Sequence, residues 1–158
     1  MLIDTHCHLD ASEFDADRNE VIKTASQQGI QMMVIPAVHR DNFEIVTQLA
    51  QQNLCCAHAL GIHPMYVERS TPEDIALLAE TLKTQLNSEQ APVAIGEIGL
   101  DFFVPDYDKE KQTFYFVEQL KLAQQFDLPV ILHVRRSIDD ILKHLRKHSV
   151  KGGIAHAF

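Results

Sequence analysis

The 158-residue sequence has no tryptophan and only three cysteines, six glycines and six prolines. So little glycine and proline excludes collagen-like and low-complexity proteins, and so little cysteine excludes a disulfide-stapled scaffold. Aromatic residues make up only 7% of the chain, but the hydrophobic fraction of 46% is that of an ordinary globular core. A chain of this length buries about two thirds of the surface that it exposes when unfolded, so intrinsic disorder is excluded as well.

Positive charge is also scarce, because 14 lysines and arginines face 22 aspartates and glutamates, giving a net charge of −8. This balance excludes a general nucleic-acid coat protein, but it is compatible with an enzyme that meets phosphates through metal ions. The odd cysteine count, with Cys55 next to Cys56, favours a reducing cytoplasm. No run approaches the roughly 18 apolar residues of a membrane span, and the N-terminus lacks a signal-peptide pattern. We therefore expect a soluble cytoplasmic protein with no membrane contact and no stable protein partner.

Six short apolar runs alternate with segments of helical periodicity, and no long linker separates them. The runs lie at residues 2–3, 32–36, 54–60, 92–95, 129–132 and 153–155. Most of them are continuous rather than alternating, as in parallel strands that are covered on both faces. This pattern predicts a single α/β domain over residues 1–158. Periodicity alone does not distinguish an open, doubly wound sheet from a closed barrel.

Local signals mark where several helices begin or end. Thr71 followed by Pro72 predicts a helix start, and Asp41 with Glu44 predicts a capping box at another. Gly29 is suited to end the first helix in a left-handed conformation.

Histidine or glutamate lies at the carboxyl end of four of the six predicted strands. His6 and His8 follow the first strand, and alternation along extended backbone places both on one face. Glu97 follows the fourth strand, and His133 and His156 end the fifth and sixth. Each residue alone is equally compatible with an ordinary structural role. Because the carboxyl ends of parallel strands meet at one edge of a sheet, four such coincidences favour a metal site.

Four histidines and one carboxylate suit two adjacent divalent ions better than one, since a carboxylate can bridge and each ion takes two imidazoles. Two ions about 3.5–4 Å apart activate a water molecule and stabilise a leaving oxygen. Zn, Mn and Mg are all admissible, and the imidazoles favour Zn or Mn. Gly96 and Gly99 bracket Glu97, which predicts a close approach of the backbone to a ligand.

Five segments resemble, in order and spacing, the TatD family of metal-dependent hydrolases. They are residues 3–10, 61–64, 96–101, 129–133 and 156–158. The resemblance implies a (β/α)8 barrel of the metal-dependent hydrolase type and cleavage of phosphodiester bonds in DNA, as a deoxyribonuclease. It implies that His6 and His8 hold one ion and that His133 and His156 hold the other. Glu97 would be the catalytic carboxylate that bridges both ions.

The length of the sequence is short for this fold. Six units in 158 residues take about 26 residues each, so eight would need roughly 210. We therefore expect six of the eight strand–helix units here, truncated after the sixth strand. The aspartate that the resemblance implies as a further ligand and general base would then lie beyond Phe158.

Three further residues are candidates for substrate binding. His63 and Arg135 could contact a substrate phosphate, and Asp101 could orient a ligand or that arginine. Structural alternatives carry similar weight: His63 could pack on Pro64, and Arg135 could pair with Asp101 or Asp139.

The leading hypothesis is a two-metal hydrolase that acts on phosphodiesters, with DNA ends as substrate. The same barrel and ligands also serve hydrolysis of C–N or ester bonds in amidohydrolases. A third hypothesis, from a different class, is a catalytically incomplete fragment that acts as a binding module.

Overall fold

The computed structural model describes residues 2–157, so Phe158, the last residue of the fifth TatD-like segment, lies outside the described residues. Six parallel strands form one sheet in which neighbours in space are neighbours in sequence. The strands are β1 (Leu2–Asp4), β2 (Ile30–Pro36), β3 (Cys56–Leu60), β4 (Ala94–Asp101), β5 (Val130–Arg135) and β6 (Gly153–His156). Sequential order is that of a barrel, because a doubly wound sheet reverses direction at a switch point. The order therefore decides between the two architectures that periodicity left open.

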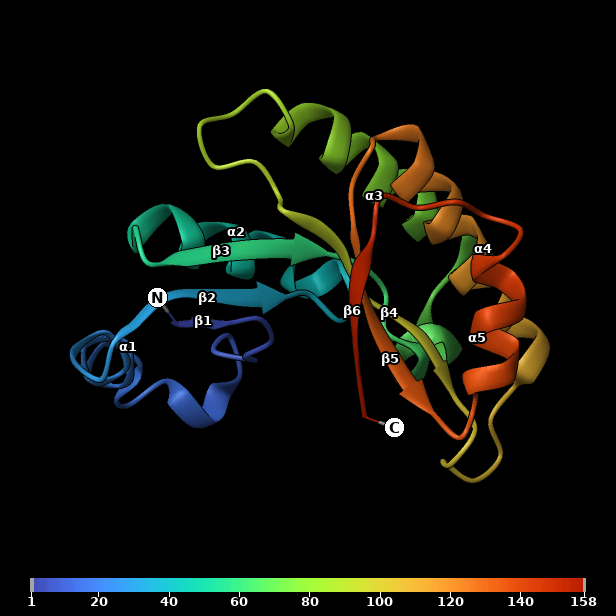
Figure 1. The fold of residues 1–158 in the computed structure, drawn as a ribbon, viewed down its shortest axis with the longest axis horizontal. Coiled ribbons are helices and arrows are strands. Elements are labelled where there is room, and N and C mark those ends of the chain that lie inside the picture. Colours follow the sequence, from blue (N-terminus) through green and yellow to red (C-terminus); the bar gives the residue numbers. More distant parts are fainter. Residues whose placement is uncertain (1, 158) are drawn as a thin grey trace.

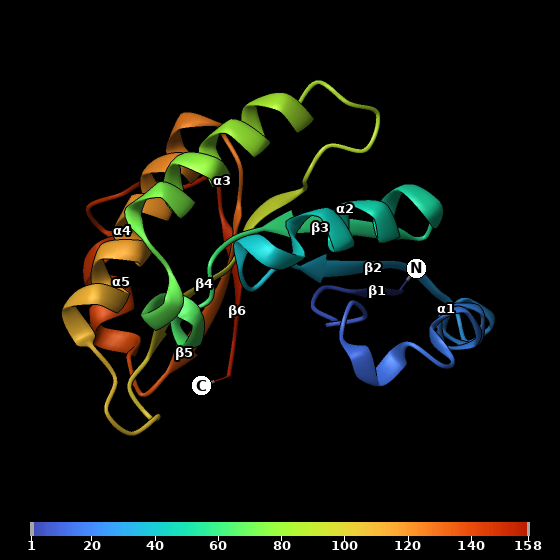
Figure 2. The same ribbon diagram turned by 180° about the vertical axis from the view of Figure 1, so that it is seen from behind.

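Helices lie along the outside of the curled sheet (Figures 1 and 2). They are α1 (Arg18–Gln27), α2 (Phe43–Gln52), α3 (Pro72–Gln85), α4 (Lys109–Gln125) and α5 (Ile138–Leu145). Three short 3-10 helices, η1 (Ser12–Phe14), η2 (Arg40–Asn42) and η3 (Pro64–Arg69), follow the carboxyl ends of β1, β2 and β3. In barrels of this kind the loops after the strands carry the catalytic residues, and here the loops after β1, β2 and β3 contain these short helices at one end of the sheet.

The core matches the continuous apolar character of the predicted strands. All eight residues of β4 are buried, and a large cluster of side chains packs between the sheet and the helices. A second, small cluster of Ala59, Ala94 and Ile131 joins three adjacent strands. The central strands β4 and β5 are therefore covered on both faces, as runs without alternation predict. The edge strands differ, because β1 exposes Leu2 and Ile3 and β6 exposes Ile154.

The curl of the sheet brings its two edges together at the carboxyl ends of the strands. His6 follows β1 at one edge and His156 ends β6 at the other, yet their ring centroids are 3.9 Å apart. This convergence places residues from all parts of the chain around one point.

Two of the predicted helix signals are confirmed. Thr71 is the N-cap of α3 with Pro72 at the first position, and Asp74 completes a capping box. Gly29 follows the end of α1 with a φ of 92°.

The predicted capping box of Asp41 and Glu44 is wrong. The helix η2 precedes α2, and the ring of His39 accepts a hydrogen bond from the amide of Asp41. Asn42, which immediately precedes α2, directs its side-chain oxygen to the amides of Val38 and His39 instead of capping the helix. Hydrogen bonds between η2 and the loop that precedes it therefore form in place of the predicted capping box.

No helix within residues 2–157 is both long enough and apolar enough to span a membrane. The three cysteines, Cys7, Cys55 and Cys56, are free thiols. The cytoplasmic location stays a prediction.

Asp74 provides a test of how η2 and α3 are connected. Its buried carboxylate accepts from the Thr71 amide at 2.9 Å and from Arg40 Nη1 at 2.7 Å. Burial raises the pKa of Asp74, but the hydrogen bonds from Thr71 and Arg40 lower it by more. The pKa of the folded protein therefore lies below the usual value for aspartate. We expect Asp74→Asn to lower the free energy of unfolding by about 1–2 kcal/mol at neutral pH, measured by urea titration.

Because the folded-state pKa of Asp74 is depressed, the stabilisation is present above the unfolded pKa and is lost as the pH falls through the folded value. The difference between wild type and Asp74→Asn should therefore shrink below about pH 4. Glu73→Gln, which changes an exposed carboxylate in the same helical turn, is the control and should lower stability much less than Asp74→Asn. Equal losses in both variants would contradict the assignment.

Candidate metal centre

Five histidines surround the side chain of Glu97, which is 1% exposed in the middle of β4. They are His6, His8, His63, His133 and His156. The fold thus gathers all five residues proposed from the sequence as metal ligands. It also adds His63, which the sequence suggested only as a substrate contact.

The two oxygens of Glu97 face different histidines. Oε2 lies 3.1 Å from His6 Nε2 and 3.2 Å from His8 Nε2. Oε1 lies 2.9 Å from His133 Nδ1 and 3.3 Å from His63 Nε2, and it also contacts His156 Nε2. A single carboxylate therefore separates two groups of imidazoles, one on each oxygen.

The spacing of these atoms fits divalent cations. His6 Nε2 and His8 Nε2 are 3.1 Å apart. Neighbouring ligands of an ion with bonds of about 2.0–2.1 Å are separated by about 2.8–3.0 Å in octahedral and about 3.3–3.4 Å in tetrahedral geometry, which bracket this distance. Ligand atoms of His6, His8 and Glu97 form one compact group, and those of His63, Glu97 and His133 form another. Glu97 Oε2 is buried, and among the described residues His6 Nε2 and His8 Nε2 lie near it without forming a hydrogen bond of good geometry. A cation between these three atoms would satisfy the oxygen.

The charge states suit cation binding. Burial raises the pKa of Glu97, but the close contacts with the surrounding histidines, His133 and His6 foremost, lower it more, so the carboxylate is anionic. Burial is the main cause that lowers the pKa of His63 and of His156, which favours neutral rings. The contact with Glu97 raises the pKa of His8. At His133 burial lowers the pKa less than Glu97 and Asp101 raise it, so a cation would displace protons from these two rings. An anionic carboxylate beside neutral imidazoles is the protonation state in which such groups bind metal.

A bulge in β4 positions Glu97. Ile95 pairs with Val130 and Ile98 pairs with Leu132, so β4 carries one more residue than β5 across this stretch. A bulge of this kind redirects a side chain relative to the regular pleat. Glu97 lies at the bulge itself, which accounts for a carboxylate on a strand that is otherwise apolar and buried.

The two glycines around Glu97 allow a close approach to β5. Their expected approach to a ligand stays a prediction. A Cβ on Gly96 would lie 2.6 Å from the Cβ of Ile131, and one on Gly99 would lie 2.0 Å from the carbonyl oxygen of His133. The glycines therefore let the bulged strand stay against its neighbour.

Asp101 connects this centre to the loops. Its Oδ2 lies 3.0 Å from His133 Nε2 and its Oδ1 accepts from the Phe103 amide at 2.9 Å. Arg135 Nη1 lies 3.9 Å from the same Oδ2, whereas residues 2–157 show no ion pair between Arg135 and Asp139. A carboxylate behind a metal-binding histidine fixes the ring and its tautomer.

A family model described as TatD related DNase matches residues 3–158. The chain belongs to the TatD-related DNase family. The resemblance drawn from five short segments is thereby confirmed over nearly the whole sequence.

Two relatives illustrate this TatD-related family. An Escherichia coli K12 protein named uncharacterized metal-dependent hydrolase YjjV is 41% identical over 158 residues, covering 99% of this chain and 60% of the relative. Human deoxyribonuclease TATDN3 is 33% identical over 168 residues, again covering 99% of this chain and 60% of the relative. The chain therefore spans about three fifths of the length of these proteins.

The crystal structure of the TatD homolog YjjV from Escherichia coli superposes with a TM-score of 0.93 at 39% sequence identity. The match covers 99% of this chain and 60% of that one. It confirms the α/β fold of the metal-dependent hydrolase barrel type, of which six strands are present here.

Two residues near this TatD-type centre were not singled out from the sequence. Asp10 Oδ1 is buried without a hydrogen-bond partner among the described residues and lies 4.0 Å from His8 Nδ1. Its other oxygen accepts from Asn42 Nδ2 at 2.7 Å. The sequence could have pointed to Asp10, because it lies two residues after the candidate ligand His8. It could not have pointed to Asn42, because the contact of Asn42 with Asp10 spans 32 residues of sequence.

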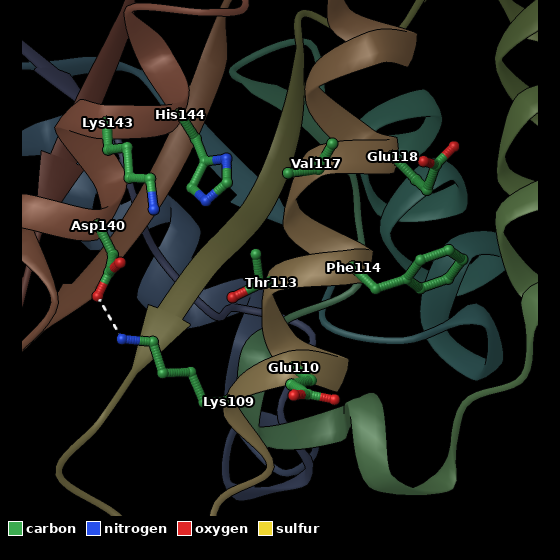
Figure 3. Close-up of a pocket in the computed structure, with 9 residues that line it drawn as sticks. All are labelled: Lys109, Glu110, Thr113, Phe114, Val117, Glu118, Asp140, Lys143 and His144. Carbon is green, nitrogen blue, oxygen red and sulfur yellow. Dashed lines mark hydrogen bonds and ion pairs between the residues drawn. The ribbon is translucent and has the colours of Figure 1, made fainter.

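Two cavities lie at different distances from this chemistry. One opens directly beside the centre and is lined by His8, His63, Asp10 and Tyr66, among others. The other is a groove between α4 and α5 in which Lys109 Nζ pairs with Asp140 Oδ2 at 2.7 Å (Figure 3). This outer groove contains none of the residues around Glu97, so the first cavity is the candidate substrate site.

Gly99 provides a test of the close contact between β4 and β5. Gly99 and Gly152 both have left-handed φ values, 147° and 141°, but an added Cβ meets nothing within 4 Å at Gly152. We expect Gly152→Ala to cost about 1–2 kcal/mol of unfolding free energy, from backbone strain alone. Gly99→Ala should cost at least about 3 kcal/mol more, because its methyl group overlaps the backbone of His133. Urea unfolding of both variants measures the difference, and similar losses would refute it.

Proposed function

We propose that the protein is a divalent-metal-dependent hydrolase of phosphodiester bonds in DNA, with two ions bridged by Glu97. The division of the two Glu97 oxygens between two groups of histidines carries this proposal. His6 and His8 would hold one ion, and His133 and His156 the other. The imidazole-rich donor set favours Zn or Mn over Mg.

Ions bound there would polarise a phosphoryl oxygen, activate water as a nucleophile and stabilise the leaving oxygen. The protein residues have separate tasks. Glu97 supplies the negative charge that would attract the ions at both metal positions. Asp101 accepts from His133 Nε2, which leaves the lone pair of Nδ1 directed at the centre.

His63 is suited to donate a hydrogen bond to substrate. Its Nδ1 accepts from the Met65 amide at 3.1 Å, and that nitrogen is therefore unprotonated. A neutral ring then carries its proton on Nε2, which lies 3.3 Å from Glu97 Oε1. His63 therefore presents an N–H at the centre and lines the adjacent cavity, where it can meet a phosphoryl oxygen.

The phosphodiester substrate is supported by two observations. Relatives of the chain are named deoxyribonucleases. Arg135, 41% exposed, lies at the end of β5 next to Asp101, where its guanidinium can contact a phosphate.

Metal binding tests the bridging role of Glu97. Isothermal titration of the full-length, metal-free protein with Zn or Mn should give two ions per chain. Glu97→Gln should weaken both by about 100-fold or more, because one side chain serves both positions. His148→Gln, which changes a histidine paired with Gln124 outside the centre, is the matched control and should leave both ions bound. One ion in the wild type, or two in Glu97→Gln, would contradict the bridge.

Turnover tests the substrate class. The full-length protein with Zn, Mn or Mg should cleave single-stranded DNA oligonucleotides, and Glu97→Gln should lower kcat/KM by about 10³-fold. A parallel panel of amide and carboxylic ester substrates distinguishes amidohydrolase chemistry. Turnover of that panel alone would replace the phosphodiester proposal, and no turnover of either class would favour a binding module.

A further inference from the structure

An exposed cluster of one aromatic ring and two arginines lies where β4 and β5 end. Phe103 is 45% exposed, two residues after the last residue of β4. The guanidinium carbon of Arg135 lies 3.8 Å from the centroid of its ring, and that of Arg136 lies 4.5 Å away. A guanidinium plane that lies over an aromatic ring covers part of its face and presents its own flat outer surface.

The backbone holds this arrangement at a conformational cost. Arg136 has a φ of 52°, a left-handed conformation that residues with a side chain rarely adopt. The next residue, Ser137, is buried and its Oγ donates to the carbonyl of Leu100 in β4 at 2.7 Å. The strand ends that carry Phe103 and Arg136 are thereby tied together. Such conformations persist where the surroundings enforce them, often at binding sites.

The charge at this position contrasts with the rest of the chain, whose net charge is −8. Among residues 2–157, the one carboxylate close to Arg135 is that of Asp101, at 3.9 Å. Arg136 forms no ion pair within residues 2–157. Lys109, which lies over the neighbouring Phe102 ring at 4.8 Å, is neutralised by Asp140. Arg136 therefore leaves an uncompensated positive charge on an exposed aromatic surface.

Asp101 links this surface to the metal centre. One carboxylate receives the amide of Phe103 on Oδ1 and faces His133 Nε2 and Arg135 with Oδ2. A ligand that extends from the centre along the ends of β4 and β5 would reach Phe103 next.

We propose that Phe103, Arg135 and Arg136 form a stacking platform for an unpaired nucleobase of single-stranded DNA, next to the bond that is cleaved. The proposal rests on the proposed phosphodiesterase function and adds the residues that recognise an unpaired base. A base stacks on the outer guanidinium plane and on the exposed part of the Phe103 ring, and the free N–H groups of Arg136 donate to the adjacent phosphate. Bases in a duplex are already stacked on one another, so only an unpaired base fits.

Binding of a fluorescein-labelled single-stranded oligonucleotide in EDTA, followed by anisotropy, tests the platform without cleavage. For the full-length protein, Phe103→Ala should raise Kd about 5- to 100-fold, the range expected for loss of one stacked base. Arg136→Ala should raise Kd and reduce the slope of log K against log salt by about one. Arg136→Lys should keep that slope but lose part of the affinity, because lysine is charged without being planar.

Two matched controls are available in the chain. Phe114 on α4 is also 45% exposed and lies in the outer groove of Figure 3. Arg146 is exposed just past the C-terminal end of α5, at the opposite end of the sheet from Arg136. Phe114→Ala and Arg146→Ala should bind the oligonucleotide as the wild type does. Thermal unfolding of each variant verifies that it is folded.

The outcomes separate this proposal from the function on which it rests. Equal Kd values for Phe103→Ala and Phe114→Ala, or tighter wild-type binding to duplex than to single strand, would overturn the platform even where the wild type cleaves DNA. A different pair of results would support the platform and refute the proposed function. In that case Phe103→Ala binds the oligonucleotide more weakly than the wild type, and the wild type hydrolyses no phosphodiester. Where both hold, KM for the oligonucleotide should rise in Phe103→Ala by about the same factor as Kd.

Discussion

The negative charge of Glu97, buried in the middle of an apolar sheet, is the constraint on which the rest of the site depends. A carboxylate that is 1% exposed is too costly without cationic or hydrogen-bonding partners. Five histidines meet that requirement, and they come from the ends of β1, β3, β5 and β6. The sheet must curl until its edges approach for these rings to reach one side chain. The curl of the sheet is therefore what allows the histidines to surround the buried charge of Glu97.

The local structure around β4 serves the same requirement. The bulge between Ile95 and Ile98 directs the carboxylate toward the histidines, and Gly96 and Gly99 let the distorted strand remain paired with β5. Asp101, four residues further along the same strand, then orients His133 and anchors the backbone of Phe103. The strand β4 thus supplies the charge of Glu97, sets the direction of its side chain and, through Asp101, fixes the position of Phe103.

Much of the candidate site could be predicted because it rests on local patterns. His6, His8, His133 and His156 follow or end apolar runs, and parallel strands direct their carboxyl ends to one edge. The residues that could not be predicted depend on distant partners. Asn42 acts through Asp10, 32 residues away, and His39 takes the place of a capping box that Asp41 and Glu44 indicated. The two glycines were recognised, but their close approach to the neighbouring strand was not.

The sequence by itself determined the alternation of strands and helices, the family and the residue types that converge, because these follow from periodicity over a few residues and from motifs at fixed spacing. Only the tertiary structure decided that the strands follow one another in barrel order, that the two oxygens of Glu97 face separate histidines and that Arg135 and Arg136 stack on Phe103. These features depend on strand register and on the curl of the whole sheet. Both are set by the packing of segments far apart in the chain, which no local pattern records.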